Sequence, residues 1–87
     1  MTNDKLISLL SSVDIELTCP ASLRMSLKRK VAKALCFDRT LELGLAMGAV
    51  EQELSEAATE AEEDRLRMKS RMLLAQCKAV EAVARVI

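Results

Sequence analysis

The chain has 87 residues, 51% of them hydrophobic and only 1% aromatic, and its 13 basic and 13 acidic side chains give a formal net charge of zero. A chain of this length makes one small domain with a thin core, here residues 1–87. The sequence has no His, no paired carboxylate in an apolar setting, no Gly-rich phosphate loop and no candidate base beside Ser or Cys, which argues against an enzyme. No stretch approaches the roughly 18 apolar residues of a membrane span. With two glycines and one proline, the composition predicts an all-α domain of short N-terminal helices followed by longer ones.

The first helix is predicted over residues 3–13, with Thr2 or Asn3 as its N-cap. Its apolar stripe consists of Leu6, Leu10, Val13 and Leu17. The alternation of Val13, Ile15 and Leu17 equally allows an extended exit from this helix. Pro20 then ends the element, because proline disfavours helical geometry in the residue before it.

A second, basic helix is predicted over residues 21–35. Its inward positions are Leu23, Leu27, Val31, Ala34 and Leu35, and its outward positions include Arg24, Lys28, Arg29, Lys30 and Lys33. Residues 36–38 are expected to form a short break, after which Asp38 caps the next helix.

A third helix is predicted over residues 39–56. Its stripe contains Leu43, Met47, Val50, Leu54, Ala57 and Ala61. Gly44 and Gly48 lie four residues apart on a neighbouring face with Leu41 and Leu45. Glycine is unfavourable inside a helix, so this pair indicates either close approach to another backbone or a tolerated weak spot.

The last helix is predicted over residues 60–86. Its seam alternates spacings of four and three, which is typical of a helix that packs along another helix; the members are Leu66, Ser70, Leu73, Cys77, Val80, Ala84 and Ile87. No Gly, Pro or Asn follows Ala49, so propensity alone allows one helix from residue 39 to 86. A change of phase near Ala61 and a T-x-x-E capping box at Thr59 and Glu62 instead predict a turn within residues 55–62 and an antiparallel α-hairpin.

The charges are arranged in blocks along the chain. Residues 1–36 hold six basic and three acidic side chains, residues 37–64 hold one and nine, and residues 65–87 hold six and one. Antiparallel packing places the acidic block beside a basic arm, although solvated faces of opposite sign explain the pattern equally well.

The three cysteines, Cys19, Cys36 and Cys77, show no C-x-x-C spacing and have no histidine to complete a metal site. We expect Cys36 and Cys77 to be buried small apolar residues and Cys19 to be the most exposed thiol. The sequence predicts no metal, no cofactor and no small-molecule substrate, and the unpaired cysteines indicate a cytoplasmic protein.

The excess of apolar helix faces predicts binding to a helical protein partner, to further copies of the chain, or to both. Methionines at partly exposed positions suit such contacts because their side chains adapt to a partner's surface. The predicted protein-binding residues are Leu43, Met47, Val50, Leu54, Leu66, Met68, Met72, Leu73, Val80 and Ile87.

The alternative is a helix-turn-helix DNA-binding regulator with the break at residues 36–38. Its phosphate-contacting residues would be Lys28, Arg29, Lys30, Lys33 and Arg39. Nucleic acid is the less favoured partner, because the supposed recognition helix presents leucines together with Glu42, which repels phosphate.

A short, aromatic-poor, all-α chain with small-residue seams from Pro20 to Ile87 resembles the small co-chaperones of bacterial type III secretion needle subunits. The resemblance implies an α-hairpin that pairs with a larger, tetratricopeptide-like chaperone, and together these keep the needle subunit from polymerising before export. It also implies that the stripe of Leu43 or the seam of Leu66 contacts the larger chaperone. The added N-terminal helix and the basic second helix depart from this plan.

Overall fold

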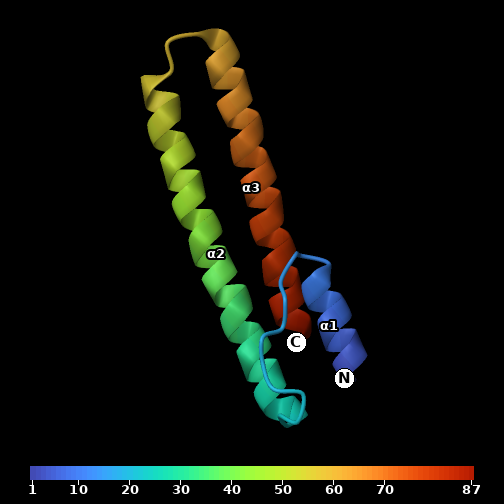
Figure 1. Ribbon diagram of the computed structural model, residues 1–87. Helices are drawn as coiled ribbons and strands as arrows, with labels where there is room; N and C mark the ends of the chain where they lie inside the picture. The colour runs from blue at the N-terminus through green and yellow to red at the C-terminus, as the bar shows by residue number, and fades with distance from the viewer.

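The computed structural model describes residues 1–87 and contains three helices, α1 (Asn3–Ser11), α2 (Met25–Glu56) and α3 (Glu60–Val86). Helices α2 and α3 run antiparallel and pack side by side, while α1 lies at the end of the hairpin opposite the turn (Figure 1). The molecule is a rod with principal extents of 54 × 17 × 16 Å. The predicted all-α class and the antiparallel α-hairpin are therefore confirmed.

The turn between α2 and α3 is short and lies within the predicted range. Thr59 is the N-cap of α3, and its hydroxyl accepts a hydrogen bond from the Glu62 amide at 3.2 Å. The Glu62 carboxylate accepts from the amide of Ala58 at 3.3 Å, one residue before the position found in a standard capping box. These two bonds end the chain reversal and start α3 at Glu60.

The predicted break at residues 36–38 is wrong, because α2 is continuous from Met25 to Glu56. The separate helices predicted over 21–35 and 39–56 are one helix, which begins after a turn in which the Leu23 amide donates to the Pro20 carbonyl. Cys36 is buried in the same contact as Ala32 and Leu43, so the apolar stripe runs through the supposed break. Residues 36–38 contain no Gly or Pro, and packing of α2 against α3 stabilises them as helix.

The chain leaves α1 two residues earlier than predicted. The Ile15 amide donates to the Leu10 carbonyl at 2.9 Å and the Asp14 amide donates to the Ser11 carbonyl at 3.0 Å, the bond pair of a Schellman motif. Asp14 takes the left-handed conformation with φ of 58°, and Ile15 is buried behind it. Val13 lies in this turn and Leu17 in the non-helical segment after it, and both pack against the core, so neither belongs to the helix.

The core is concentrated at the end of the rod where α1 packs. Leu6 and Leu10 of α1 are fully buried. The cluster that they join consists of Leu6, Leu10, Ile15, Ala32, Cys36, Leu43, Val80, Val83 and Ile87. Toward the turn the buried side chains are Val50 and Leu66, and that half of the rod consists of two helices alone.

Two cations of α2 hold the other segments in place at the same end. The ammonium of Lys28, itself buried, donates to Asn3 Oδ1 and to the Ala21 carbonyl, each at 3.0 Å. The Arg29 guanidinium donates through Nε to the Ile87 carbonyl at 2.9 Å. A cation at the carboxyl end of α3 also complements the partial negative charge of the helix terminus.

No helix combines the length and the apolar content needed to cross a membrane.

The left-handed conformation of Asp14 predicts opposite effects for two substitutions. Asp14→Val should lower the free energy of unfolding by about 1–2 kcal/mol, because a β-branched residue is strained at positive φ. Asp14→Gly should leave stability unchanged or raise it slightly, because glycine adopts this conformation without strain. Urea denaturation followed by circular dichroism measures both, and equal destabilisation by the two variants would show that the Asp14 side chain matters more than its backbone.

Candidate protein-binding surface

The predicted protein-binding residues divide into three groups according to where the structure places them. Five are buried between the helices: Leu43, Val50, Leu66, Val80 and Ile87. Three are half-buried, namely Met47, Leu54 and Leu73. These eight belong to the inner contact of the hairpin, so in this structure the stripe and the seam face each other instead of a partner.

Met68 and Met72 are different, because they are 63% and 58% exposed on the side of α3 away from α2. They begin a second heptad pattern, with spacings of four and three, that we call the outer seam of α3. Its members are Met68, Met72, Ala75, Ala79, Ala82 and Val86, all of them exposed. The two methionines are among the predicted protein-binding residues and the alanines are not, although the spacing rule that identifies the inner seam also applies to the outer one.

The charges beside the outer seam are almost all positive. Arg67 pairs with Glu63 at 3.6 Å and with Asp64 at 4.0 Å. The other basic side chains of α3 are exposed and form no ion pair; they are Arg65, Lys69, Arg71, Lys78 and Arg85. After Asp64 the one acidic residue of α3 is Glu81. The outer seam is thus a narrow apolar strip of small residues and methionines with cationic edges.

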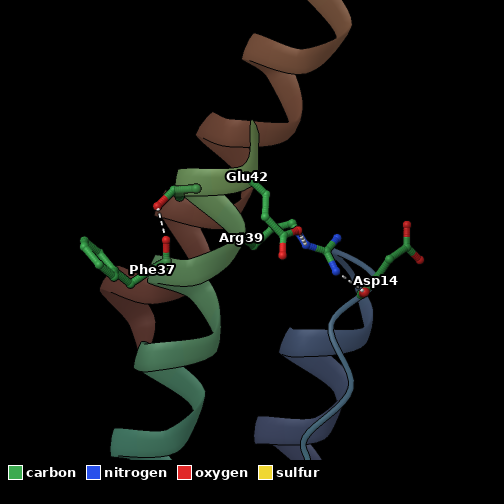
Figure 2. A network of polar contacts seen from close by, with 5 residues as sticks. Asp14, Phe37, Arg39 and Glu42 are labelled. Atoms are coloured by element: carbon green, nitrogen blue, oxygen red, sulfur yellow. Dashed lines mark hydrogen bonds and ion pairs between the residues drawn. The ribbon is translucent and has the colours of Figure 1, made fainter. Parts of the chain in front are cut away.

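A second outward apolar surface lies on α2, mostly away from its contact with α3, and we call it the outer face of α2; one edge of it, at Lys33 and Phe37, borders Glu81, Ala84 and Arg85 of α3 across a small cavity. Its members are Leu27, Ala34, Phe37, Leu41, Leu45 and Gly48, all exposed. Leu45 is 78% exposed and Phe37 63% exposed, and Figure 2 shows the Phe37 ring on the side of α2 away from Asp14. Leu41 and Leu45 lie beside the glycine pair as the sequence indicates, whereas the prediction that Leu27 and Ala34 point inward is wrong, because both are exposed.

The residues of the nucleic-acid alternative do not form one free basic surface. Lys28 and Arg29 are engaged within the molecule, as described above, whereas Lys30 and Lys33 are exposed. Arg39 donates to the Asp14 carbonyl at 3.3 Å and pairs with Glu42 at 3.6 Å, so it joins α2 to the segment after α1 (Figure 2). The turn that a helix-turn-helix requires at residues 36–38 is also absent, because α2 is continuous there.

The three cysteines are all free thiols. Burial raises the pKa of the Cys36 thiol above its ordinary value. Burial and the neighbouring Glu81 carboxylate, whose Oε1 lies 3.8 Å from Sγ, raise the pKa of Cys77. Cys36 is buried as expected, but Cys77 and Cys19 are both half-buried. No group of three or more His, Cys, Asp or Glu side chains is arranged to hold a metal ion.

Comparison of the chain with protein-family models, curated proteins and solved structures finds no match.

The division into inner and outer seams predicts unequal costs for two neighbouring truncations on α3. Leu66→Ala should lower the free energy of unfolding by about 2–3 kcal/mol, because Leu66 is 4% exposed and its removal leaves a cavity between the helices. Met68→Ala should change it by less than about 0.5 kcal/mol, since Met68 projects into solvent. Thermal or urea unfolding of both variants tests this, and a comparable loss in the two would contradict the assignment of the seams.

The carboxylate beside Cys77 predicts a change in thiol reactivity. Glu81→Gln removes a negative charge that favours the protonated thiol, so the pKa of Cys77 should fall and its thiolate fraction at pH 8 should rise. The rate of alkylation by iodoacetamide, followed at Cys77 by peptide mass spectrometry, should therefore increase by a factor of a few. Cys36 serves as the internal control, because its pKa is raised by burial alone and its rate should not change.

Proposed function

We propose that the chain is a non-enzymatic helical adaptor that binds an amphipathic helix of a partner protein along the outer seam of α3. The observation that carries this proposal is the exposed heptad spacing of Met68, Met72, Ala75, Ala79, Ala82 and Val86. A heptad seam of apolar residues is the surface with which a helix packs along another helix. Apart from Ala79, which borders Val13 and Asp14 across a small cavity, the seam faces solvent, so a helix that packs along it would come from another protein.

The composition of the seam indicates how the partner packs. The alanines at its centre let a second helix axis approach closely, and the methionines at one end supply flexible apolar contact. Burial of this strip contributes roughly 25 cal/mol for each Å² of apolar area, before the costs of association are subtracted. The affinity is therefore expected to depend on a few central residues, as in most interfaces.

The edges of the seam indicate the charge of the partner. Lys69, Arg71 and Lys78 have no ion-pair partner, and a helix with acidic side chains at its own edges would neutralise them. Two α3 seams facing each other would instead bring like charges together over most of their length, which disfavours self-association through this surface. We therefore expect the partner to be a protein other than a second copy of this chain, with acidic side chains beside its apolar stripe.

A finer form of the proposal makes the chain a co-chaperone of a type III secretion needle subunit, located in the cytoplasm. Its support is the general plan, an all-α hairpin of 87 residues with seams of small side chains, and the three free cysteines suit a reducing compartment. In this form the larger, tetratricopeptide-like chaperone occupies the outer seam of α3. The inner residues Leu43 and Leu66 stabilise the hairpin and do not contact that chaperone.

The adaptor proposal is tested by affinity purification of the tagged chain from its native cells, with nuclease treatment and quantitative mass spectrometry. A stoichiometric protein partner should be recovered with the unchanged chain and reduced at least about tenfold by Met72→Glu. Because Met72 is exposed, this variant should remain folded, which circular dichroism checks. Raising the salt concentration should also release the partner, since its flanking charges are solvent-exposed.

The matched control is Leu45→Glu, which places the same charge on the outer face of α2. A partner that is lost with Met72→Glu and kept with Leu45→Glu supports the outer seam of α3 as the binding surface. Retention of the partner by both variants, or recovery of no protein partner, would overturn the proposal. The identity of the recovered protein decides the type III secretion form separately.

A further inference from the structure

Helix α2 is apolar on two opposite sides, and only one of them is covered. Its inner side, with Leu43 and Val50, packs against α3. Its outer side, with Phe37, Leu41 and Leu45, is open to solvent over several turns. An exposed strip of large apolar side chains marks an interaction surface, so the outer face of α2 is a candidate binding surface.

The glycines of α2 lie on or beside this open face. A Cβ placed on Gly44 or Gly48 would meet no atom within 4 Å, and neither residue has positive φ. Nothing inside the molecule therefore requires glycine at these positions, although glycine is less favourable than alanine in a helix. The sequence leaves two explanations for the glycine pair, close approach of another backbone or a tolerated weak spot in the helix. The open space around both glycines excludes close approach within the hairpin, and close approach of a backbone from outside the molecule agrees with the structure.

The charges along α2 differ in sign between its two ends. Its N-terminal part carries Arg24, Lys30 and Lys33, and its C-terminal part carries Glu51, Glu53 and Glu56. None of these six side chains forms an ion pair within the chain. A second α2 laid parallel would repel at both ends, whereas one laid antiparallel would be attracted at both ends. The outer face of α2 is thus electrostatically complementary to itself in one orientation, unlike the cationic outer seam of α3.

The helical positions of these charges agree with such a pairing. Lys33 and Glu51 are separated by about five full turns at 3.6 residues per turn, so they lie on the same edge of the outer face. A two-fold axis perpendicular to a pair of antiparallel helices brings equal edges together. Lys33 of each copy then lies on the same edge as Glu51 of the other, while Arg24 faces the end that carries Glu53 and Glu56. This pairing places the axis level with residue 42, midway between Lys33 and Glu51, so Leu41 lies next to the axis and the apolar contact is centred there, with Phe37 and Leu45 on either side.

We propose that a second copy of this chain docks on the outer face of α2, forming an antiparallel, two-fold symmetric dimer centred near Leu41. The dimer leaves the outer seam of α3 free, on the opposite side of each hairpin. The dimer proposal therefore does not depend on the adaptor proposal. If both proposals hold, each dimer presents two outer seams of α3, one on each copy, to partner proteins. A single helix pair is a small interface, so the dimer is expected to form at micromolar or higher concentration.

Sedimentation equilibrium of the full chain from micromolar to millimolar concentration tests the dimer. The weight-average mass should rise from the monomer value of 9.6 kDa to twice that value and no further. Leu41→Glu should weaken association at least about tenfold, and Met72→Glu should leave it unchanged. Gly48→Ala should weaken association while raising the melting temperature measured at concentrations where the chain is monomeric, which separates an interface effect from a folding defect.

A charge exchange tests the orientation. Lys33→Glu alone and Glu51→Lys alone should each weaken the dimer, and the variant with both substitutions should regain it, because each Lys33–Glu51 pair is restored with its signs reversed. A monomer at every concentration, or a dimer insensitive to Leu41→Glu, would overturn the proposal. So would loss of association with Met72→Glu, growth beyond the dimer, or failure of the double variant to recover.

Discussion

The contact between α2 and α3 along their inner surfaces is the interaction on which the rest of the structure depends. Neither helix has the tertiary support of a large core, and helices in water are only marginally stable without packing. The contact also keeps α2 helical through residues 36–38, where the sequence suggests a break. By fixing which side of each helix turns inward, it decides which apolar residues are left outside.

The N-terminal segment reinforces this contact at one end only. Leu6 and Leu10 of α1 close the groove between the long helices, and Lys28, Arg29 and Arg39 bond to backbone or amide oxygens of other segments there. The half of the rod near the turn has no third layer. Cations that suggested phosphate contacts in the sequence thus serve largely to hold chain segments together.

The two outward apolar surfaces differ in charge, and the difference separates the proposals that rest on them. The outer seam of α3 has cationic edges along most of its length, so it favours an acidic partner and disfavours a copy of itself. The outer face of α2 is basic at one end and acidic at the other, so the charges of an antiparallel copy complement its own. Apolar area alone would not distinguish the two surfaces; the distribution of exposed charge does.

The sequence by itself determined the helical class, the turn near Thr59 and the helix that follows it, because these depend on local propensity and on a capping box whose two partners lie three residues apart. Only the tertiary structure decided that residues 36–38 stay helical and that Leu43, Leu66 and Val80 are buried between the helices and do not face a partner. Heptad spacing shows that a helix packs along another helix, but both the inner and the outer seam of α3 have that spacing. Which seam packs inside the molecule depends on the apolar stripe of α2, and the residue spacing of α3 alone does not reveal that stripe.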